Sequence, residues 1–302
     1  MRPGQSLSKL TARLLVKLEN HFKHHRPDLV LAHGDTTTCF ATALSSFYQQ
    51  IPFFHVEAGL RSYHLNSPFP EEFNRQSVAP MAHHHFAPTE LEKINLINDG
   101  IQDHKITVTG STVHDAIHII KTKNRNADHI PDIGTRPTVV VTLHRREANQ
   151  AMQQTLTGLK HVAIERPDVM FICPIHPNPN AQNAFRSILG GHENIKLLDP
   201  LPYAEFISLL MKSNLVVTDS GGVQEESVYF GKRVLLARAE TERRDGLDSG
   251  LVQLIGHDVE FTRRSIKQAL CNSNFTHELL GENGMPLHAS ETIARVVERN
   301  IV

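Results

Sequence analysis

Apolar and polar positions along this chain predict helices and strands in alternation. Leucines and Phe22 recur at three- and four-residue spacings over residues 7–22, which is typical of one face of a helix, and the pattern stops before Pro27. Residues 28–34 (DLVLAHG) form a short apolar run closed by glycine, as in a strand, and residues 36–50 are long enough for a helix. The chain therefore opens with a helix followed by a strand-loop-helix unit.

The alternation continues to residue 122 and then restarts. Further strands with their loops are predicted over 51–59, 84–89 and 105–110, and helices from about residue 71, over 91–99 and over 111–122. Later segments with strand character are 138–144, 168–176, 195–200, 214–222 and 232–238. Because apolar strands that alternate with helices form parallel sheets covered on both faces, the predicted fold is α/β with two Rossmann-like, doubly wound domains.

A polar stretch separates the two series of strands. Residues 123–136 (KNRNADHIPDIGTR) contain Pro131 and Gly134 and are typical of an interdomain linker. We therefore predict an N-terminal domain over 1–122 and a C-terminal domain over 137–302. The final helix, near 290–301, keeps an apolar spacing and is expected to pack back across the molecule.

Composition excludes several classes of function. Lys plus Arg (31) and Asp plus Glu (32) nearly balance, so no overall charge attracts nucleic acid or an anionic membrane. The three cysteines are too few and too scattered for a disulfide framework, which fits a reducing compartment. The sequence has no signal-peptide core and no run of about 18 apolar residues. A cytoplasmic protein without membrane or nucleic-acid partners is predicted.

Twenty histidines, three of them adjacent at His83, His84 and His85, raise the question of a metal site. Three adjacent side chains cannot all point one way on a strand or helix. Neither HExxH nor a Cys/His ligand spacing accompanies them. We therefore predict no metal and interpret these histidines as a polar entrance to a strand.

The motif that most clearly indicates a phosphate-binding site is DSGGVQEE at residues 219–226. It follows a predicted strand and opens a helix. Gly221 and Gly222 let the backbone approach an anion, and the helix N-terminus offers unpaired N–H groups. Ser220 adds a hydroxyl donor, and Glu226 could accept hydrogen bonds from a ribose diol. The alternative is an ordinary capped helix with a glycine turn.

Cationic residues follow another predicted strand of the second domain. His144, Arg145 and Arg146 could clamp a diphosphate, because arginine suits bidentate phosphate contacts and histidine can donate to an oxygen or move a proton. The alternative is that the arginines pair with Glu147 and other surface acids. Arg243 is a further candidate for phosphate binding.

The first domain supplies acids. Asp35 and Glu57 each follow a predicted strand, and Glu71 and Glu72 begin a helix, so these acids can converge at one edge of a sheet. Gathered carboxylates raise one another's pKa, which suits general acid-base catalysis near neutral pH. Asp35 could instead be a helix N-cap and Glu71 a first-turn acid. Arg61 and Arg75 could orient the acids or bind a ligand.

Eight segments in order resemble the non-hydrolysing UDP-N-acetylglucosamine 2-epimerases: HGDTTT, HVEAGLRS, SPFPEEFNR, TGSTVHDA, TLHRRE, HPNPN, DSGGVQEE and RAETER, all within residues 33–243. The resemblance implies two Rossmann-like domains that face a cleft, the architecture of many glycosyltransferases. It also implies reversible epimerisation at C2 through elimination and re-addition of UDP, with no cofactor. A homodimer that supplies N-acetylmannosamine units for surface polysaccharide is implied as well.

The resemblance also assigns roles to individual residues. The implied catalytic residues are Asp35, Glu57, Glu71 and His144. The implied UDP-binding residues are Arg75, His176, Phe206, Ser220, Gly221, Gly222, Glu226 and Arg243.

One departure bears on activity. The family begins with a strand and a GTRPE turn, which this sequence lacks, so we expect an incomplete first domain that exposes apolar surface. Two alternatives therefore stay open. The chain could bind UDP-sugar without catalysis, or it could be a glycosyltransferase with the same two-domain fold.

Overall fold

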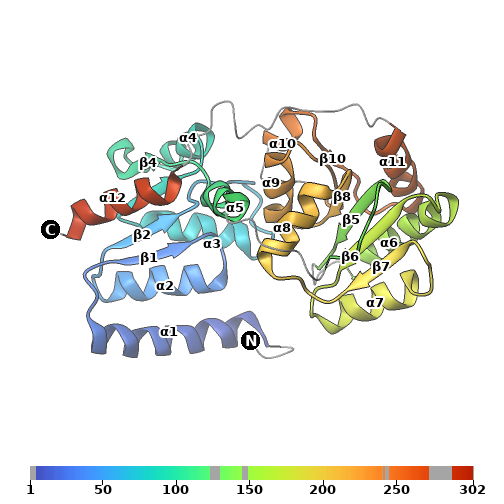
Figure 1. Ribbon diagram of the computed structural model, residues 1–302. Helices are drawn as coiled ribbons and strands as arrows, with labels where there is room; N and C mark the ends of the chain where they lie inside the picture. Colours follow the sequence, from blue (N-terminus) through green and yellow to red (C-terminus); the bar gives the residue numbers. More distant parts are fainter. Residues whose placement is uncertain are drawn as a thin grey trace. The chain divides into compact units, whose positions relative to one another are not determined.

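The computed structural model describes residues 5–122, 130–144, 149–239, 241, 245–271 and 288–301. The chain divides into two compact units, Met1–Asp115 with Pro286–Val302, and Ala116–Met285. Half of the expected linker, residues 123–129, lies outside the described residues. The last helix belongs to the first unit, although it follows the second in the sequence (Figure 1).

The first unit is built on a parallel sheet of four strands in the order β1-β2-β3-β4. Its elements are α1 (Leu7–His25), β1 (Val30–His33), α2 (Thr37–Tyr48), β2 (Phe53–Val56), α3 (Glu71–Val78), η1 (Ala79–Met81), β3 (His84–Ala87), α4 (Glu90–Asn98), η2 (Asp103–Lys105), β4 (Ile106–Val108), α5 (Thr112–Thr122), which runs across the division, and α12 (Ala289–Ile301).

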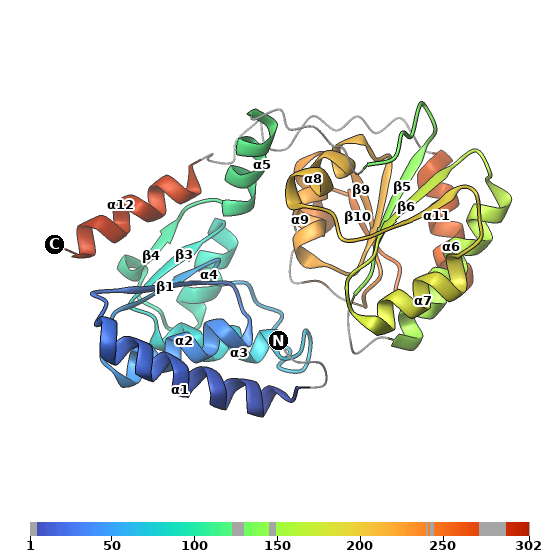
Figure 2. The same cartoon turned by 60° about the horizontal axis from the view of Figure 1, so that its bottom comes forward.

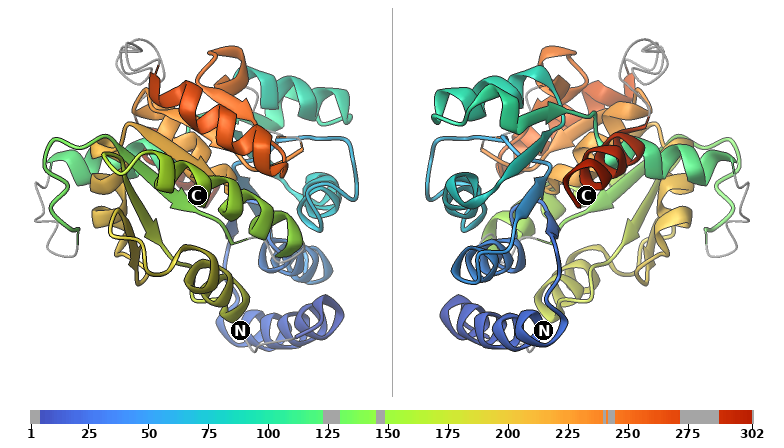
Figure 3. Two further views of the ribbon diagram at one scale, coloured as in Figure 1. Left: turned by 90° about the vertical axis from the view of Figure 1, so that its right-hand side faces the viewer. Right: turned by 90° about the vertical axis from the view of Figure 1, so that its left-hand side faces the viewer.

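Helices cover both faces of this sheet, as the apolar strands predict. Phe53 of β2 packs with Cys39 and Ala43 of α2. The next residue, Phe54, points the opposite way and packs in a cluster with Ile293 of α12. α2 and α12 therefore cover opposite faces (Figure 1), and α1 packs against α2 as an outer layer (Figure 3).

β1 lies at one edge of the described sheet. In the described part of the chain β1 pairs with β2 alone, and the side chain of Leu31 is 46% exposed. Its residues alternate between half-buried and exposed, whereas all four residues of β2 are buried. Apolar surface is therefore exposed at this edge of the first unit.

The second unit is built on a parallel sheet of six strands in the order β10-β9-β8-β5-β6-β7. Its elements are β5 (Thr138–Thr142), α6 (Asn149–Glu165), β6 (Met170–Pro174), α7 (Pro179–Leu189), β7 (Ile195–Leu198), α8 (Tyr203–Lys212), β8 (Leu215–Thr218), α9 (Gly221–Tyr229), β9 (Arg233–Leu236), α10 (Asp245–Asp248), β10 (Val252–Leu254) and α11 (Val259–Cys271).

The strand order of this second sheet reverses between β5 and β8. The chain runs outward from β5 through β6 to β7, then returns to β8 and continues outward to β10. α6, α7 and α11 cover one face, and α8 and α9 lie on the other (Figure 2). Ligands of such sheets bind beyond the carboxyl ends of the strands at the point of reversal. The ends of β5 and β8 are therefore the place to search for a binding site.

The histidines that we expected at a strand entrance partly lie within the strand. His84 and His85 belong to β3, and His85 is fully buried between β2 and β4. Burial lowers the pKa of His85 to about 3, so its imidazole is neutral. In the described ranges, no three His, Cys, Asp or Glu side chains gather as a metal ion would need, and no helix there has the length and apolarity to span a membrane.

Asp115 attaches α12 to the first unit. Its carboxylate accepts backbone N–H groups of His288 (2.9 Å), Ala289 (3.3 Å) and Ser290 (2.7 Å) at the start of α12. Burial favours the protonated acid, but these donors outweigh it and lower the pKa of Asp115. Asp115 therefore caps a helix that is distant in the sequence.

Asp115→Ala should lower the free energy of unfolding by about 1 kcal/mol, because helix caps contribute about that much. The pKa is lower in the folded than in the unfolded chain, so the stabilisation is present above the unfolded pKa and is lost as pH falls through the folded one. Urea unfolding at neutral pH and at acidic pH measures both effects. An equal loss at both pH values would contradict this role.

Candidate functional site

Asp35 lies in the turn between β1 and α2. The N-cap of α2 is Thr36, whose hydroxyl accepts the backbone N–H of Cys39 at 3.3 Å, so the reading of Asp35 as the cap is wrong. The carboxylate oxygen Oδ2 of Asp35 instead accepts Nε and Nη2 of Arg75, at 2.9 and 2.7 Å. Two donors on one oxygen fix the orientation of this carboxylate.

Arg75 is itself held in place. Its side chain is 4% exposed, and its Nη1 donates to Oε2 of the fully buried Glu72 at 3.2 Å. Glu72 also accepts the backbone N–H groups of Ser62 and Tyr63, at 3.0 and 3.1 Å. This network joins α3 to the loop after β2. Of the two roles that the sequence left open for Arg75, the geometry supports orientation of Asp35.

Glu57 follows β2 and approaches the same turn. Its backbone adopts φ 61°, its side chain is 20% exposed, and its Oε2 lies 3.4 Å from His33 Nε2. A Cβ added to Gly34 would lie 3.3 Å from the same oxygen, and Gly34 has φ 75°. Glycine at this position therefore permits both the turn and the close approach of the carboxylate.

The pKa of Cys39 is affected by both of these acids. Burial, with the charges of Asp35 and Glu57, raises the pKa of the Cys39 thiol to about 12. Both carboxylates therefore lie near the first turn of α2, and Cys39 is an unreactive thiol. Glu71 is the first residue of α3, where the helix dipole favours an acid.

His55 supports this turn and was not singled out from the sequence. Its Nε2 lies 2.7 Å from the carbonyl oxygen of Gly34, and burial lowers its pKa to about 4. The ring is therefore neutral, and Nε2–H donates to the carbonyl. The signal that could have revealed His55 is its place within a buried strand two residues before Glu57.

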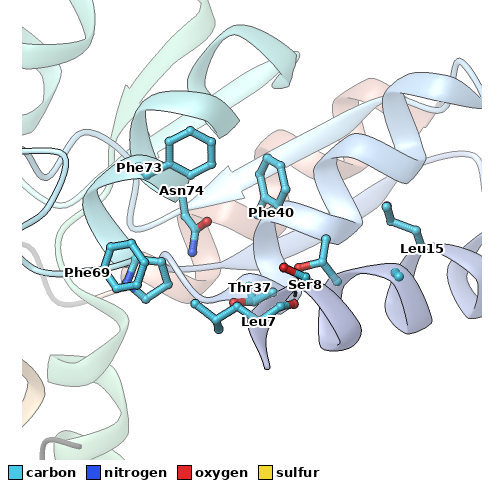
Figure 4. A pocket seen from close by; sticks show the side chains of 11 residues that line it. Leu7, Ser8, Leu15, Thr37, Phe40, Phe69, Phe73 and Asn74 are labelled. Atoms are coloured by element: carbon cyan, nitrogen blue, oxygen red, sulfur yellow. Dashed lines mark hydrogen bonds between the residues drawn. The ribbon is translucent and has the colours of Figure 1, made fainter. Parts of the chain in front are cut away.

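A cavity of about 550 Å³ lies between α1, α2 and α3 (Figure 4). Phe40, Phe69 and Phe73 line it together with side chains of α1. Asn74, also in the wall, donates from its side chain to the main-chain oxygen of Asp35 at 2.7 Å. The side chains of the expected catalytic acids do not line this apolar cavity, so we do not assign it to the reaction.

The second unit brings His144 and Asp219 together. Thr142 of β5 pairs with Thr218 of β8, so the residues just beyond the two strands meet. The backbone N–H of His144 donates to Asp219 Oδ2 at 2.9 Å, and His144 Nδ1 lies 3.0 Å from Oδ1. The His176 ring, just after β6, stacks on His144 with centroids 5.3 Å apart.

The DSGG turn opens α9, as the sequence predicted. Ser220 is the N-cap, and its Oγ accepts the backbone N–H of Val223 at 3.4 Å, as in an ordinary capped helix. Gly221 and Gly222 are the first residues of α9. Among the described residues, a Cβ added to Gly222 would meet only Ser220 Oγ, at 4.0 Å, so their packing does not require glycine there. A helix N-terminus that described side chains leave uncrowded is consistent with an anion site.

Glu226 lies further along α9 and is 8% exposed. Burial, together with the charge of Glu226 and a hydrogen bond to it, raises the pKa of the Tyr203 hydroxyl. Tyr203 begins α8, one helical turn before Phe206, so Glu226 and Phe206 belong to neighbouring parts of the unit. Tyr203 was not singled out from the sequence. Arg243, Arg145 and Arg146 lie outside the described residues.

These features define a class of protein, an α/β enzyme. Acidic side chains follow the strands of one sheet, and a glycine-rich helix N-terminus follows a strand of the other. The sequence profile of the UDP-N-acetylglucosamine 2-epimerase family matches residues 2–298. A probable UDP-N-acetylglucosamine 2-epimerase of Ralstonia solanacearum is 39% identical, with 98% of this chain and 81% of that protein aligned. The chain belongs to the UDP-N-acetylglucosamine 2-epimerase family.

Solved structures of UDP-GlcNAc 2-epimerases are also similar to this chain. The Neisseria meningitidis UDP-GlcNAc 2-epimerase bound to UDP-GlcNAc is similar with a TM-score of 0.89 and 35% identity, covering 99% of this chain and 84% of that one. The Methanocaldococcus jannaschii enzyme in complex with UDP-GlcNAc and UDP has a TM-score of 0.86 at 30% identity, covering 98% and 82%. The predicted family and α/β fold class are therefore confirmed.

Proposed function

We propose that this chain interconverts UDP-N-acetylglucosamine and UDP-N-acetylmannosamine. The observation that carries the proposal is the Neisseria structure with UDP-GlcNAc, which matches 99% of this chain. The arrangement of Asp35 and Glu57 about Gly34 supports the chemistry, because a reaction at C2 needs groups that remove and return a proton.

In the proposed reaction a carboxylate of the first unit takes the proton from C2. The electrons of the C2–H bond form a C1–C2 double bond, and the electrons of the C1–O bond leave with UDP, which gives a 2-acetamidoglucal. In the reverse sense a proton returns to C2 on the other face and a UDP oxygen bonds to C1. The sugar's oxidation state is unchanged overall, so the reaction needs no redox cofactor.

The described side chains suggest a division of tasks. Asp35, Glu57 and Glu71 are proposed to serve the proton transfers. Ser220, Gly221 and Gly222 are proposed to hold the diphosphate at the α9 N-terminus, with His144 as a donor to it. The remaining proposed UDP-binding residues are His176, Phe206, Glu226 and Arg243, and Arg75 is proposed to orient Asp35.

The test is to approach equilibrium from both sides. Incubated separately with each UDP-sugar, the purified chain should produce the same final mixture of the two, detected by chromatography and NMR. Irreversible release of free N-acetylmannosamine would instead indicate hydrolysis, and release of UDP only when an acceptor is added would indicate glycosyl transfer. Either result would overturn the proposal.

We further propose that the chain forms a homodimer in the cytoplasm and supplies N-acetylmannosamine units for surface polysaccharide. Exposed aromatic side chains at the end of α2, Phe47 (56%) and Tyr48 (68%), support an association surface. The buried free thiols Cys39 and Cys173 are consistent with a reducing compartment. Sedimentation analysis of the purified chain tests the dimer.

A further inference from the structure

Asp219 contacts both the backbone and the ring of His144. The backbone N–H of His144 donates to Oδ2 at 2.9 Å and to Oδ1 at 3.2 Å, and Oδ1 also lies 3.0 Å from the ring Nδ1. None of these contacts is visible in the sequence, since the two residues are 75 positions apart. The pair exists because β5 and β8 are neighbours in register, so His144 and Asp219 both lie just beyond the paired strand ends.

Burial differs sharply between the two partners. The Asp219 side chain is 6% exposed, whereas the His144 side chain is 37% exposed. Nδ1 faces the buried carboxylate, so Nε2 is the ring nitrogen that we expect to meet a ligand. The stacked ring of His176, with an interplanar angle of 25°, restricts rotation of His144 further.

The contact fixes which ring nitrogen carries the proton. An ionised carboxylate accepts hydrogen bonds and cannot donate them, so His144 Nδ1 must carry hydrogen. The neutral imidazole then has its lone pair on Nε2. When Nε2 takes a proton, the imidazolium is stabilised by the buried negative charge of Asp219.

We propose that Asp219 is a positioning residue that holds His144 in the Nδ1–H tautomer and presents Nε2 to the bound diphosphate. This deepens the proposed function and rests on it for the identity of the ligand. With Nε2 protonated, His144 donates a hydrogen bond to the oxygen that departs from C1, so charge that develops on UDP is stabilised. In this proposal Asp219 acts on the reaction through His144.

Asp219→Asn tests this proposal, because the hydrogen bonds of His144 determine how an asparagine side chain is oriented at position 219. The backbone N–H of His144 can only donate and lies nearer to Oδ2 (2.9 Å) than to Oδ1 (3.2 Å), so we expect the amide oxygen of the new side chain at the place of Oδ2. The amide NH2 then faces Nδ1 and donates to it, which forces the proton of neutral His144 onto Nε2. The variant thus keeps size and hydrogen bonding but reverses the tautomer.

The primary readout is 15N NMR of the full chain with labelled histidine, with and without UDP. The His144 signals are assigned by their loss in His144→Gln. The unmodified chain should show Nδ1–H and a shift of the His144 signals on adding UDP, and Asp219→Asn should show Nε2–H. An Nε2–H tautomer in the unmodified chain would overturn the proposal whatever the variants do.

The kinetic readout separates positioning from a structural role. Asp219→Asn leaves a neutral Nε2–H donor but removes the negative charge that stabilises the imidazolium. A hydrogen bond from a charged donor is roughly twice as strong as one from a neutral donor, so kcat should fall by about ten-fold while UDP affinity stays within a few-fold. In a His144→Gln background, Asp219→Asn should have little further effect. Losses that multiply in the double variant, or an unchanged kcat, would refute positioning through His144.

The outcomes also separate this inference from the proposed function. If the unmodified chain shows Nδ1–H and a UDP-dependent shift but interconverts no UDP-sugar, the assignment of epimerase activity fails and the positioning by Asp219 stands. If the chain is active but His144 is in the other tautomer, the positioning fails and the epimerase activity stands.

Discussion

Glu57→Gln is expected to slow interconversion of the two UDP-sugars by about a hundred- to ten-thousand-fold, the usual contribution of a general acid or base. Glutamine keeps the size of the side chain and cannot take a proton. The largest effect should be on kcat, because UDP is proposed to bind through the second unit. Steady-state kinetics in both directions and UDP titration of the same preparation measure the two effects.

The matched control is Glu90→Gln. Glu90 is also a glutamate of the first unit and is exposed at the start of α4, so this change should leave kcat within two-fold, roughly the scatter expected of surface changes. The role assigned to Glu57 fails if its glutamine variant retains more than a tenth of the activity of the Glu90 variant.

Arg75→Ala is expected to destabilise the first unit by about 3–5 kcal/mol, as breaking a buried ion pair does. The change removes the donor to Glu72, which is fully buried, and both donors to Asp35. Activity should fall with stability, because the Asp35 carboxylate is no longer held in one orientation. Urea unfolding followed by circular dichroism measures the stability, with kinetics at low temperature for the fraction that folds.

Arg166→Ala is the control for that change. Arg166 makes a similar pair with Asp168, at 2.7 Å, but the two side chains are 32% and 55% exposed. Exposed pairs contribute only about 0–1 kcal/mol, so the loss should be small. Equal losses for the two arginines would show that the buried network around Arg75 does not stabilise the first unit.

Local patterns were sufficient to predict most elements of the fold. Strands such as β2 and β5 are mostly apolar, and α1 has a clear helical spacing, so each is recognisable within a short window. The short β10 was missed, because three residues with one exposed position give no strong pattern. α11 after it was missed as well, although its helix is amphipathic.

The site was predicted only in part, for a physical reason. Asp35 and Glu57 follow strands, so the parallel topology alone places them at one edge. The partners of such residues depend on register and packing between distant segments. Arg75 is 40 positions from Asp35, and Asp219 is 75 from His144. Their pairing therefore could not be read from the sequence.

The central claim, reversible epimerisation at C2, is tested most directly by an NMR time course of the purified chain with UDP-N-acetylglucosamine in D2O. We predict that deuterium enters at C2 while the manno epimer appears, and that Glu57→Gln suppresses both signals. UDP binding with neither deuterium at C2 nor the manno epimer in the unmodified chain would contradict the account.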